Sequence, residues 1–370
     1  MVTKNEYHPD SVSHPGMILE EKLEELNMPV KEFAVRTGKP EQTIIKVLNG
    51  KSSITPDMAI QFEKVLGIPA KGWLRHDRAY QEYKARIKYR QAIKAAIDWM
   101  RRFPYKDMVK CRWVADTRKP EERVENLFSF FGVSSAEAWA DYFMEGKLKV
   151  SFRLSLKSAQ NPEALSVWLR HGEITAPKME AAPYDPNKFK TALKQLKQFI
   201  HTPEDPAFFR KLQETCAQAG VKVIYSPKIK GAPVSGATRF IGDHPVIQIS
   251  NRYKWHDTFW FNFFHEAGHI LKHGRKDVFL EGIEYDEADQ KKEKEADTFA
   301  ARQLLPGKIL ENLISSDTIT EESILQAAEQ ANTHPGIVVG RLQYEKIIEY
   351  NQFNELRVRL DLDGMEKIQN

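Results

Sequence analysis

The stretch FFHEAGHILKHG, residues 263–274, constrains this chain most strongly, because its histidine spacing has a chemical meaning only on a helix. His265 and His269 are four residues apart, so a helix places them on one face, about 6 Å apart along its axis. Two neutral imidazoles at that spacing can each bring a ring nitrogen ~2.0–2.1 Å from one zinc ion. The stretch therefore predicts a helix that carries two metal ligands.

Glu266 follows the first histidine and is rotated about 100° from it around the helix. Its side chain is expected to reach a water molecule beside the metal, where a carboxylate acts as general base. The HExxH pattern is short enough to arise by chance in a chain with 11 histidines. The alternative is a structural helix that is rich in histidine, and a third ligand would decide against it.

The segment EKEADTFAARQLLP, residues 293–306, supplies candidates for that ligand. Glu293 and Asp297 are one helical turn apart, so Glu293 can bind the metal while Asp297 accepts a hydrogen bond from a ligand histidine. Glu295 points about 200° away from Glu293 and is the second choice for the third ligand. The alternative is a solvated, charged helix with an apolar stripe.

Two further histidines are candidates for supporting roles. His273 lies ~12 Å along the helix from His265, so one ion cannot easily bind both. We expect it behind a ligand, at the helix end or in the cleft. His334, in THPGIVVGRL, either stabilises an oxyanion near the cleft or begins a helix.

Three short runs precede the histidine-bearing helix: GVKVIYSP, PVSGATRFI and HPVIQIS. Each is rich in β-branched or aromatic residues and bounded by turn residues, which is typical of strands. They predict a small antiparallel sheet, and with the helices around it an α+β domain.

Residues 14–76 read as five short helices. Gly38 suits a tight turn, while Thr55 and Pro56 are a typical helix start. A helix, a short turn and a second helix predict a helix-turn-helix domain, although this pattern also occurs in proteins that do not bind DNA. The second helix would enter the major groove with base and phosphate contacts from Lys39, Glu41, Gln42, Thr43, Lys46 and Lys51.

Charge supports a nucleic-acid partner for this part only. Residues 1–120 carry a net charge of +8, whereas the remainder carries −4. The alternative is a solvated basic surface. Only Cys111 and Cys216 occur and no apolar run approaches the ~20 residues of a membrane span, so we expect a cytoplasmic protein with no membrane partner.

The chain is expected to be mainly α-helical and multidomain. We predict a DNA-binding domain over 1–80, a helical linker or dimerisation region over 81–187 and a metallopeptidase domain over 188–370. The basic helical stretch after residue 76 either packs on neighbours or a second subunit, or adds phosphate contacts.

Three N-terminal blocks carry a resemblance: HPGMILEEKL, QTIIKVLNGKSSITPDMAIQFEKVLG and WLRHDRAYQEY. From about His14 to about Ala85 the chain resembles the Xre-type domain of HigA-like antitoxins. The resemblance implies operator binding as a dimer and repression of the protein's own operon. Lys39-Pro40-Glu41 departs from the small polar residue that many relatives have near the start of the recognition helix.

Three C-terminal blocks carry another: HEAGHILKHG, EKEADTFAARQLLP and HPGIVVGRLQYE. Over about residues 190–350 the chain resembles the ImmA/IrrE-like metallopeptidases, which are similar to gluzincins. The resemblance implies His265, His269 and Glu293 as zinc ligands and Glu266 as general base. It also implies a protein substrate, often a helix-turn-helix repressor.

Together these features predict a DNA-binding regulator with a zinc peptidase domain that hydrolyses a protein partner. The alternative is a DNA-binding antitoxin whose metallopeptidase-like domain is inactive and binds a toxin or senses a ligand. A third hypothesis is a peptidase whose N-terminal domain recognises a protein. An intact ligand set favours the first over the second, since a pure binding module needs no general base.

Overall fold

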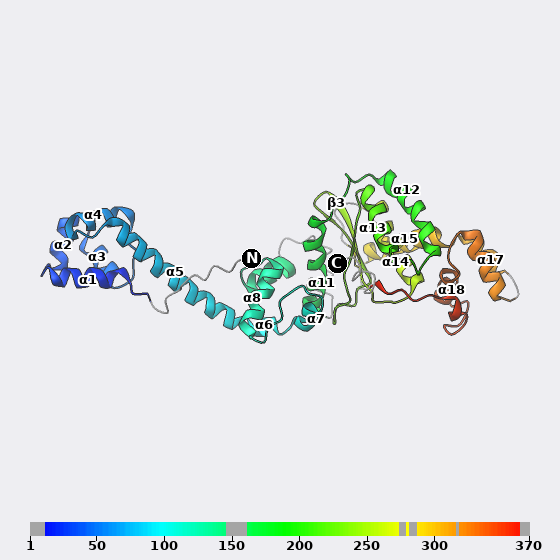
Figure 1. Ribbon diagram of the computed structural model, residues 1–370, viewed down its shortest axis with the longest axis horizontal. Helices are drawn as coiled ribbons and strands as arrows, with labels where there is room; N and C mark the ends of the chain where they lie inside the picture. Colours follow the sequence, from blue (N-terminus) through cyan, green and yellow to red (C-terminus); the bar gives the residue numbers. More distant parts are fainter. Residues whose placement is uncertain (1–11, 146–160, 274–278, 281–286, 316–317, 363–370) are drawn as a thin grey trace. The chain divides into compact units, whose positions relative to one another are not determined.

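The computed structural model describes residues 12–145, 161–273, 279–280, 287–315 and 318–362 (Figure 1). Contacts between Cα atoms divide the chain into two compact units, Met1–Ala95 and Ala96–Asn370. Each unit has a hydrophobic core of its own. The three predicted domains, 1–80, 81–187 and 188–370, stay a prediction, and the middle one includes residues 146–160, which lie outside the described residues.

The first unit has five helices, as expected from the sequence, but the fifth is not short and continues beyond residue 76 to Ala95. They are α1 (Pro15–Glu25), α2 (Val30–Thr37), α3 (Glu41–Leu48), α4 (Pro56–Leu66) and α5 (Ala70–Ala95). The predicted start and stop signals act as expected. Thr55 accepts a hydrogen bond from the Met58 amide at 3.3 Å and begins α4. Gly38 ends α2 in the left-handed region, with φ 64°, where a side chain would be strained.

The core of this unit joins all five helices. Leu19, Phe33, Ile44, Phe62 and Trp73 are at most 1% exposed. Gly16, in the first turn of α1, permits a close approach, because a Cβ there would overlap the backbone oxygen of Val47 in α3. The apolar faces of α2 and α3 are therefore committed to the core, and the polar face of α3 is left outward.

The second unit is also mainly helical, which confirms the predicted fold class. Its first part holds α6 (Ile97–Met100), α7 (Tyr105–Lys110), α8 (Pro120–Phe131), α9 (Ala136–Ala140), η1 (Asp141–Glu145), α11 (Pro162–Thr175) and η2 (Ala176–Lys178). Then follow α12 (Pro186–Leu196), η3 (Lys197–His201), α13 (Phe208–Gln218), α14 (His256–Lys272), α15 (Glu287–Leu304), α16 (Gly307–Ile314), α17 (Glu321–Ala331), α18 (Pro335–Tyr344) and η4 (Asn354–Leu356).

The three predicted strands form, but the prediction of a purely antiparallel sheet is wrong. The sheet contains β1 (Lys222–Tyr225), β2 (Gly236–Ile241), β3 (His244–Ile249) and β4 (Phe279–Leu280), in the order β1-β3-β2-β4. β2 pairs antiparallel with β3 and with β4. β1, however, pairs with β3 in parallel, so the sheet is mixed.

β3, the strand beside β1, is more deeply buried than β2, which lies between β3 and β4. All of β3 after His244 is buried, whereas the end of β2 is partly exposed. The polar Gln248 of β3 is accommodated because its amide donates to the backbone oxygen of Trp168 at 2.6 Å and to Ser226 Oγ at 2.7 Å.

Helices cover both faces of the sheet. α11 lies against one face, and α13, α14 and α15 lie on the other (Figure 1). One hydrophobic core of the unit lies on the α14 side and includes Phe259, Trp260, Phe263 and Phe264 of that helix. None of the helices in the described ranges is long and apolar enough to span a bilayer.

Candidate functional site

Helix α14 presents the histidine motif from inside the second unit. It begins at His256, ends at Lys272 and is buried on most of its surface. Its aromatic residues pack into the core, as their density suggested. His265 and His269 are each 2% exposed and Glu266 is fully buried. The motif therefore lies in a sheltered position where charge interactions are strong.

Helix α15 brings the acidic residues to this motif because α14 has a glycine at the crossing. A Cβ on Gly268 would lie 3.1 Å from Phe299 Cδ1 and 3.2 Å from the Cα of Ala296. Glycine at position 268 therefore lets the two helices approach this closely, and a larger residue there would force a small shift of the neighbouring atoms. Glu293 and Asp297 are the α15 residues that meet His265.

Three side chains converge on one point. Nε2 of His265 lies 2.9 Å from Nε2 of His269 and 3.1 Å from Oε2 of Glu293, while Oε1 of Glu293 is 3.5 Å from Nε2 of His269. These ligand atoms all lie within 4.8 Å of one another. Two ligands of a tetrahedral zinc ion are about 3.3 Å apart, given bonds of ~2.0–2.1 Å. The donor set and its spacing fit zinc.

The remaining predicted residues lie behind the two histidines. Oδ1 of Asp297 is 2.9 Å from Nδ1 of His265, which leaves Nε2 of that ring for a metal. Nδ1 of His273 is 3.0 Å from Nδ1 of His269, and Nε2 of His273 is 3.3 Å from Glu295 Oε2. Because the carboxylate of Glu295 accepts from Nε2, Nδ1 of His273 can accept from His269. Glu295 therefore contacts His273, and Glu293 contacts the histidine pair.

Protonation states in this cluster suit metal binding. Burial lowers the pKa of His269 to about 4, against the opposing effect of Glu293. Burial alone would raise the pKa of Glu293, but its contacts with His265 and His269 outweigh burial and lower the pKa to about 2. A neutral imidazole and an ionised carboxylate are the forms that bind a metal ion.

The sheet positions Glu266. Thr238 of β2 donates through Oγ1 to the backbone oxygen of Glu266 at 3.1 Å. The side chain of Glu266 lies over Gly236, the first residue of β2, where a Cβ would overlap Oε1. Strand β2 thus leaves space for this carboxylate beside the two histidines.

His334 takes a different place from the other histidines. Its Nδ1 accepts from the amide of Gly336 at 3.0 Å and so begins α18. Its ring is 5.2 Å from that of His256, the first residue of α14. His256 is nine residues before His265, about 13 Å along the helix. The structure thus places His334 at a helix start and does not bring it to the metal ligands.

The predicted DNA-contacting residues lie on α3 and at its two ends. Glu41, Gln42, Lys46 and Lys51 are exposed, and Lys39 and Thr43 are partly exposed. Ile44 and Val47 face the core, so these polar side chains are on the outward face. This is the arrangement that a major-groove reading helix requires.

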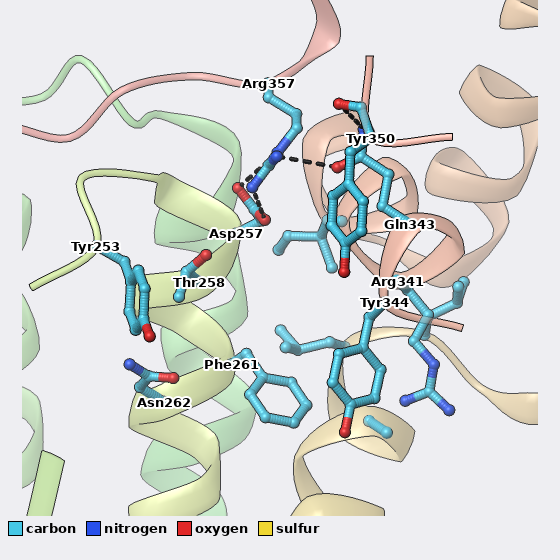
Figure 2. A pocket seen from close by; sticks show the side chains of 15 residues that line it. Tyr253, Asp257, Thr258, Phe261, Asn262, Arg341, Gln343, Tyr344, Tyr350 and Arg357 are labelled. Atoms are coloured by element: carbon cyan, nitrogen blue, oxygen red, sulfur yellow. Dashed lines mark hydrogen bonds and ion pairs between the residues drawn. The ribbon is translucent and has the colours of Figure 1, made fainter. Parts of the chain in front are cut away.

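A pocket of about 410 Å³ lies next to the cluster of metal-ligand candidates on α14 and α15, and the sequence did not predict it (Figure 2). One wall holds a buried ion pair, in which Arg357 donates to Asp257 Oδ2 at 2.7 Å and to Oδ1 at 3.3 Å. These two residues are 100 positions apart in the chain. Because no local pattern joins them, the sequence carried no signal of this pocket.

Comparisons with known proteins give separate matches for the two units. Residues 19–73 match a family described as helix-turn-helix, and residues 216–342 match the IrrE N-terminal-like domain. The uncharacterized HTH-type transcriptional regulator YddM of Escherichia coli (strain K12) is 38% identical over 66 residues, which cover 18% of this chain and 70% of that protein.

Two solved structures are similar to the N-terminal part. An antidote protein of a HigA family from Coxiella burnetii is 33% identical and covers 22% of this chain and 91% of its own, with a TM-score of 0.21. A putative antidote protein of a plasmid maintenance system from Nostoc punctiforme is 30% identical and covers 23% of this chain and 93% of its own, with a TM-score of 0.23. These TM-scores support no argument about fold.

Proposed function

Because the chain belongs to the helix-turn-helix transcriptional regulators and carries an IrrE N-terminal-like domain, we propose that it is a DNA-binding regulator whose second unit is a zinc endopeptidase acting on a protein partner. The observation that carries the proposal is the convergence of His265, His269 and Glu293 next to the buried Glu266. A module that only binds a toxin needs neither the ligand set nor the base.

The proposed chemistry divides among the named residues. Zinc, when bound, polarises the peptide carbonyl and acidifies water. Glu266 takes the proton of the attacking water and passes it to the leaving amine. Asp297 and His273 hold the two ligand rings so that each Nε2 faces the site. Gly236 leaves the space in which Glu266 lies.

The peptidase proposal is tested with Glu266→Gln. We expect both wild type and the variant to bind about one zinc ion per chain, and the variant to lose cleavage of a proteome-derived peptide library. The amide retains the size of the carboxylate but cannot accept the proton. New peptide termini are counted by mass spectrometry and zinc by elemental analysis.

Matched variants separate the roles of the two α15 glutamates. Glu293→Gln should lose zinc, and Glu295→Gln should retain it, because only Glu293 contacts both histidines. Zinc-loaded wild type that cuts no peptide would refute the peptidase proposal and favour the alternative, an inactive domain that binds a toxin or senses a ligand.

The DNA-binding proposal concerns an operator in the protein's own promoter, bound by a homodimer. Lys46→Ala and Gln42→Ala should each weaken the footprint, and Lys46→Ala should also lower the salt slope of binding by about two, because each protomer of the dimer loses one phosphate contact. Lys190→Ala, which removes an exposed positive charge from the second unit, is the control and should change neither. Binding that is absent, or that salt does not affect, would count against the proposal.

A further inference from the structure

A second pocket lies on the exposed side of α15, between that helix and the last residue of α14. Its volume of about 410 Å³ falls within the roughly 300–1,000 Å³ of binding pockets. Among the described residues that line it, one carries a negative charge, Glu295, and four carry a positive charge: Lys272, Lys291, Lys294 and Arg302. We call this second pocket the basic pocket.

The four cations of the basic pocket are not neutralised by neighbouring carboxylates. Their side chains are exposed and form no ion pair with any residue that the structure describes. By contrast, Arg86 on α5 pairs with Glu82, one turn away, at 2.8 Å. Oε2 of Glu295 lies 3.3 Å from Nε2 of His273 and so faces a side chain outside the set of cations. The pocket therefore has an excess of positive charge, which attracts an anionic partner.

The cations of α15 form a stripe that has the length of a short peptide. Positions 291, 294, 298 and 302 follow one another at spacings of three or four residues, so their side chains lie on one face of the helix. Lys291 and Arg302 are about 16 Å apart along the helix axis. An extended chain rises about 3.3 Å per residue, so about five residues of a partner would span the stripe.

The charge around the basic pocket favours a short acidic segment over a nucleic acid. Residues 121–370, which include the pocket, carry a net charge of −4. A long duplex would extend beyond the pocket and meet this negative background. A segment of about five residues would meet mainly the four cations, because charges beyond a Debye length of about 8 Å are largely screened.

The basic pocket adjoins the metal-ligand cluster through His273. Glu295 of the lining contacts Nε2 of His273, and Nδ1 of His273 lies 3.0 Å from Nδ1 of the ligand candidate His269. Lys294 also follows Glu293 directly in the chain. A segment bound in the pocket would therefore lie within a short stretch of chain from a peptide bond held at the reacting groups.

We propose that the basic pocket docks an acidic segment of the protein partner, a short extended run of aspartate and glutamate side chains. The inference rests on the proposed peptidase function in one respect, since it places this segment in the same partner that the second unit cuts. The carboxylates would pair with the four cations and steer the partner to the site. Binding at this distance from the reacting groups would hold the peptide bond in place.

The first test measures binding, which does not depend on turnover. A fluorescein-labelled pentaglutamate peptide is titrated into the full chain and followed by fluorescence anisotropy. All proteins also carry Lys46→Glu, so that the basic face of α3 does not capture the probe. We expect saturable binding that added salt weakens, and binding about tenfold weaker to the double variant Lys291→Glu, Arg302→Glu.

Two controls show whether the charge of the basic pocket is responsible. Lys190→Glu with Lys194→Glu makes the same change in net charge on the exposed face of α12 and should leave binding unchanged. Lys291→Arg with Arg302→Lys retains both positive charges and should bind as tightly as the parent. Because all these side chains are exposed, the substitutions do not threaten the fold, and thermal unfolding followed by circular dichroism verifies this.

Three outcomes would overturn the inference. The peptide fails to bind, the double variant binds it as tightly as the parent, or the α12 control weakens binding equally. A duplex of random sequence is titrated in parallel. If the double variant loses affinity for the duplex while the peptide binds to neither protein, the pocket is a nucleic-acid site and the inference is wrong.

The second test measures selectivity in the proteome-derived peptide library. Peptides cut by wild type should be enriched in aspartate and glutamate on one side of the cut, and the double variant Lys291→Glu, Arg302→Glu should lose most of that enrichment. Cleavage without the enrichment would overturn the role of the pocket in docking the substrate. Pentaglutamate binding without any cleavage would support the docking site and refute the peptidase function, so the two failures are distinguishable.

Discussion

At the residue scale, the position of Glu266 depends on Gly236, a residue that has no Cβ atom. Gly236 begins β2 at a position where a Cβ would overlap Oε1 of the Glu266 carboxylate. Thr238, two residues along, holds the backbone of Glu266 through its hydroxyl. The general-base candidate is therefore positioned from the sheet as much as from its own helix.

Gly236→Ala should displace the Glu266 carboxylate and leave the metal ligands in place. We expect zinc content to stay near wild type while the rate of peptide cleavage falls by about 100-fold, the size expected for a misplaced acid–base group. Gly307→Ala is the matched control, because the nearest atom to its Cβ would be Glu311 Oε1 at 4.0 Å. If Gly236→Ala lost zinc, or cut as fast as the control, this positioning role would be wrong.

At the element scale, α11 is joined to the sheet by polar groups that are almost entirely buried. Trp168 donates to the backbone oxygen of Ser226 at 3.2 Å, and Nδ1 of His171 lies 2.7 Å from Ser226 Oγ. The ring of His171 is stacked on that of Trp113 at 4.2 Å. Burial lowers the pKa of His171 to about 4. The interface therefore requires a neutral histidine.

This histidine gives the second unit a defined pH dependence. Its pKa is lower in the folded state than its ordinary value of 6.5, so between pH 6.5 and pH 4 the unfolded chain binds more protons. The free energy of unfolding should therefore fall as the pH falls through that window, by at most about 3 kcal/mol from this group. Urea titrations at pH 7, 5.5 and 4.5 measure it.

His171→Gln is the comparison for that measurement. It cannot titrate, so its unfolding free energy should decrease less steeply than that of wild type between pH 6.5 and 4, whereas the other ionisable groups contribute alike to both proteins. Parallel pH profiles for the two proteins would contradict the assignment.

At the scale of the whole molecule, the two units have separate cores and separate proposed ligands. The first core is built from α1 to α5, and the second surrounds the mixed sheet and α14. Operator DNA would bind only the first unit, and zinc only the second. Ligand binding stabilises the unit that contains the site.

Calorimetry of the full chain should therefore show two transitions that respond independently. Removing zinc with EDTA should lower the Tm of the second unit by several degrees and leave the first unchanged. Adding operator DNA should raise only the Tm of the first unit. A single transition, or an EDTA effect on both, would show that the units do not unfold separately.

The sequence predicted what depends on local spacing. The HExxH spacing identified a pair of histidines that lie side by side, and the cap at Thr55 and the turn at Gly38 formed as expected. From their spacing, Glu293 was predicted as a metal ligand and Asp297 as an acceptor behind a ligand histidine, and in the structure both carboxylates contact His265. These features follow from helix geometry, which few residues determine.

Features that depend on neighbours distant in the chain were missed. The parallel pairing of β1 with β3 was not expected, because strand order depends on contacts between segments that are not adjacent in the chain. The pocket that contains Asp257 and Arg357 was missed for the same reason, since these two residues meet only in the folded unit. Whether the zinc-bound domain cleaves peptides also depends on how residues that are distant in the chain lie relative to one another.

The mixed sheet also imposes an order of assembly. β2 and β3 are joined by a two-residue turn and form a hairpin from local contacts, whereas β1 reaches β3 only after the segment 226–235 has crossed over. Closing a longer loop costs more chain entropy before its contacts contribute, so non-local pairings form later. Because the hairpin contains Gly236 and Thr238, the two residues that position Glu266 are in place early. On this account a refolding chain acquires its proposed cutting activity only after α14 and α15 have docked on that hairpin.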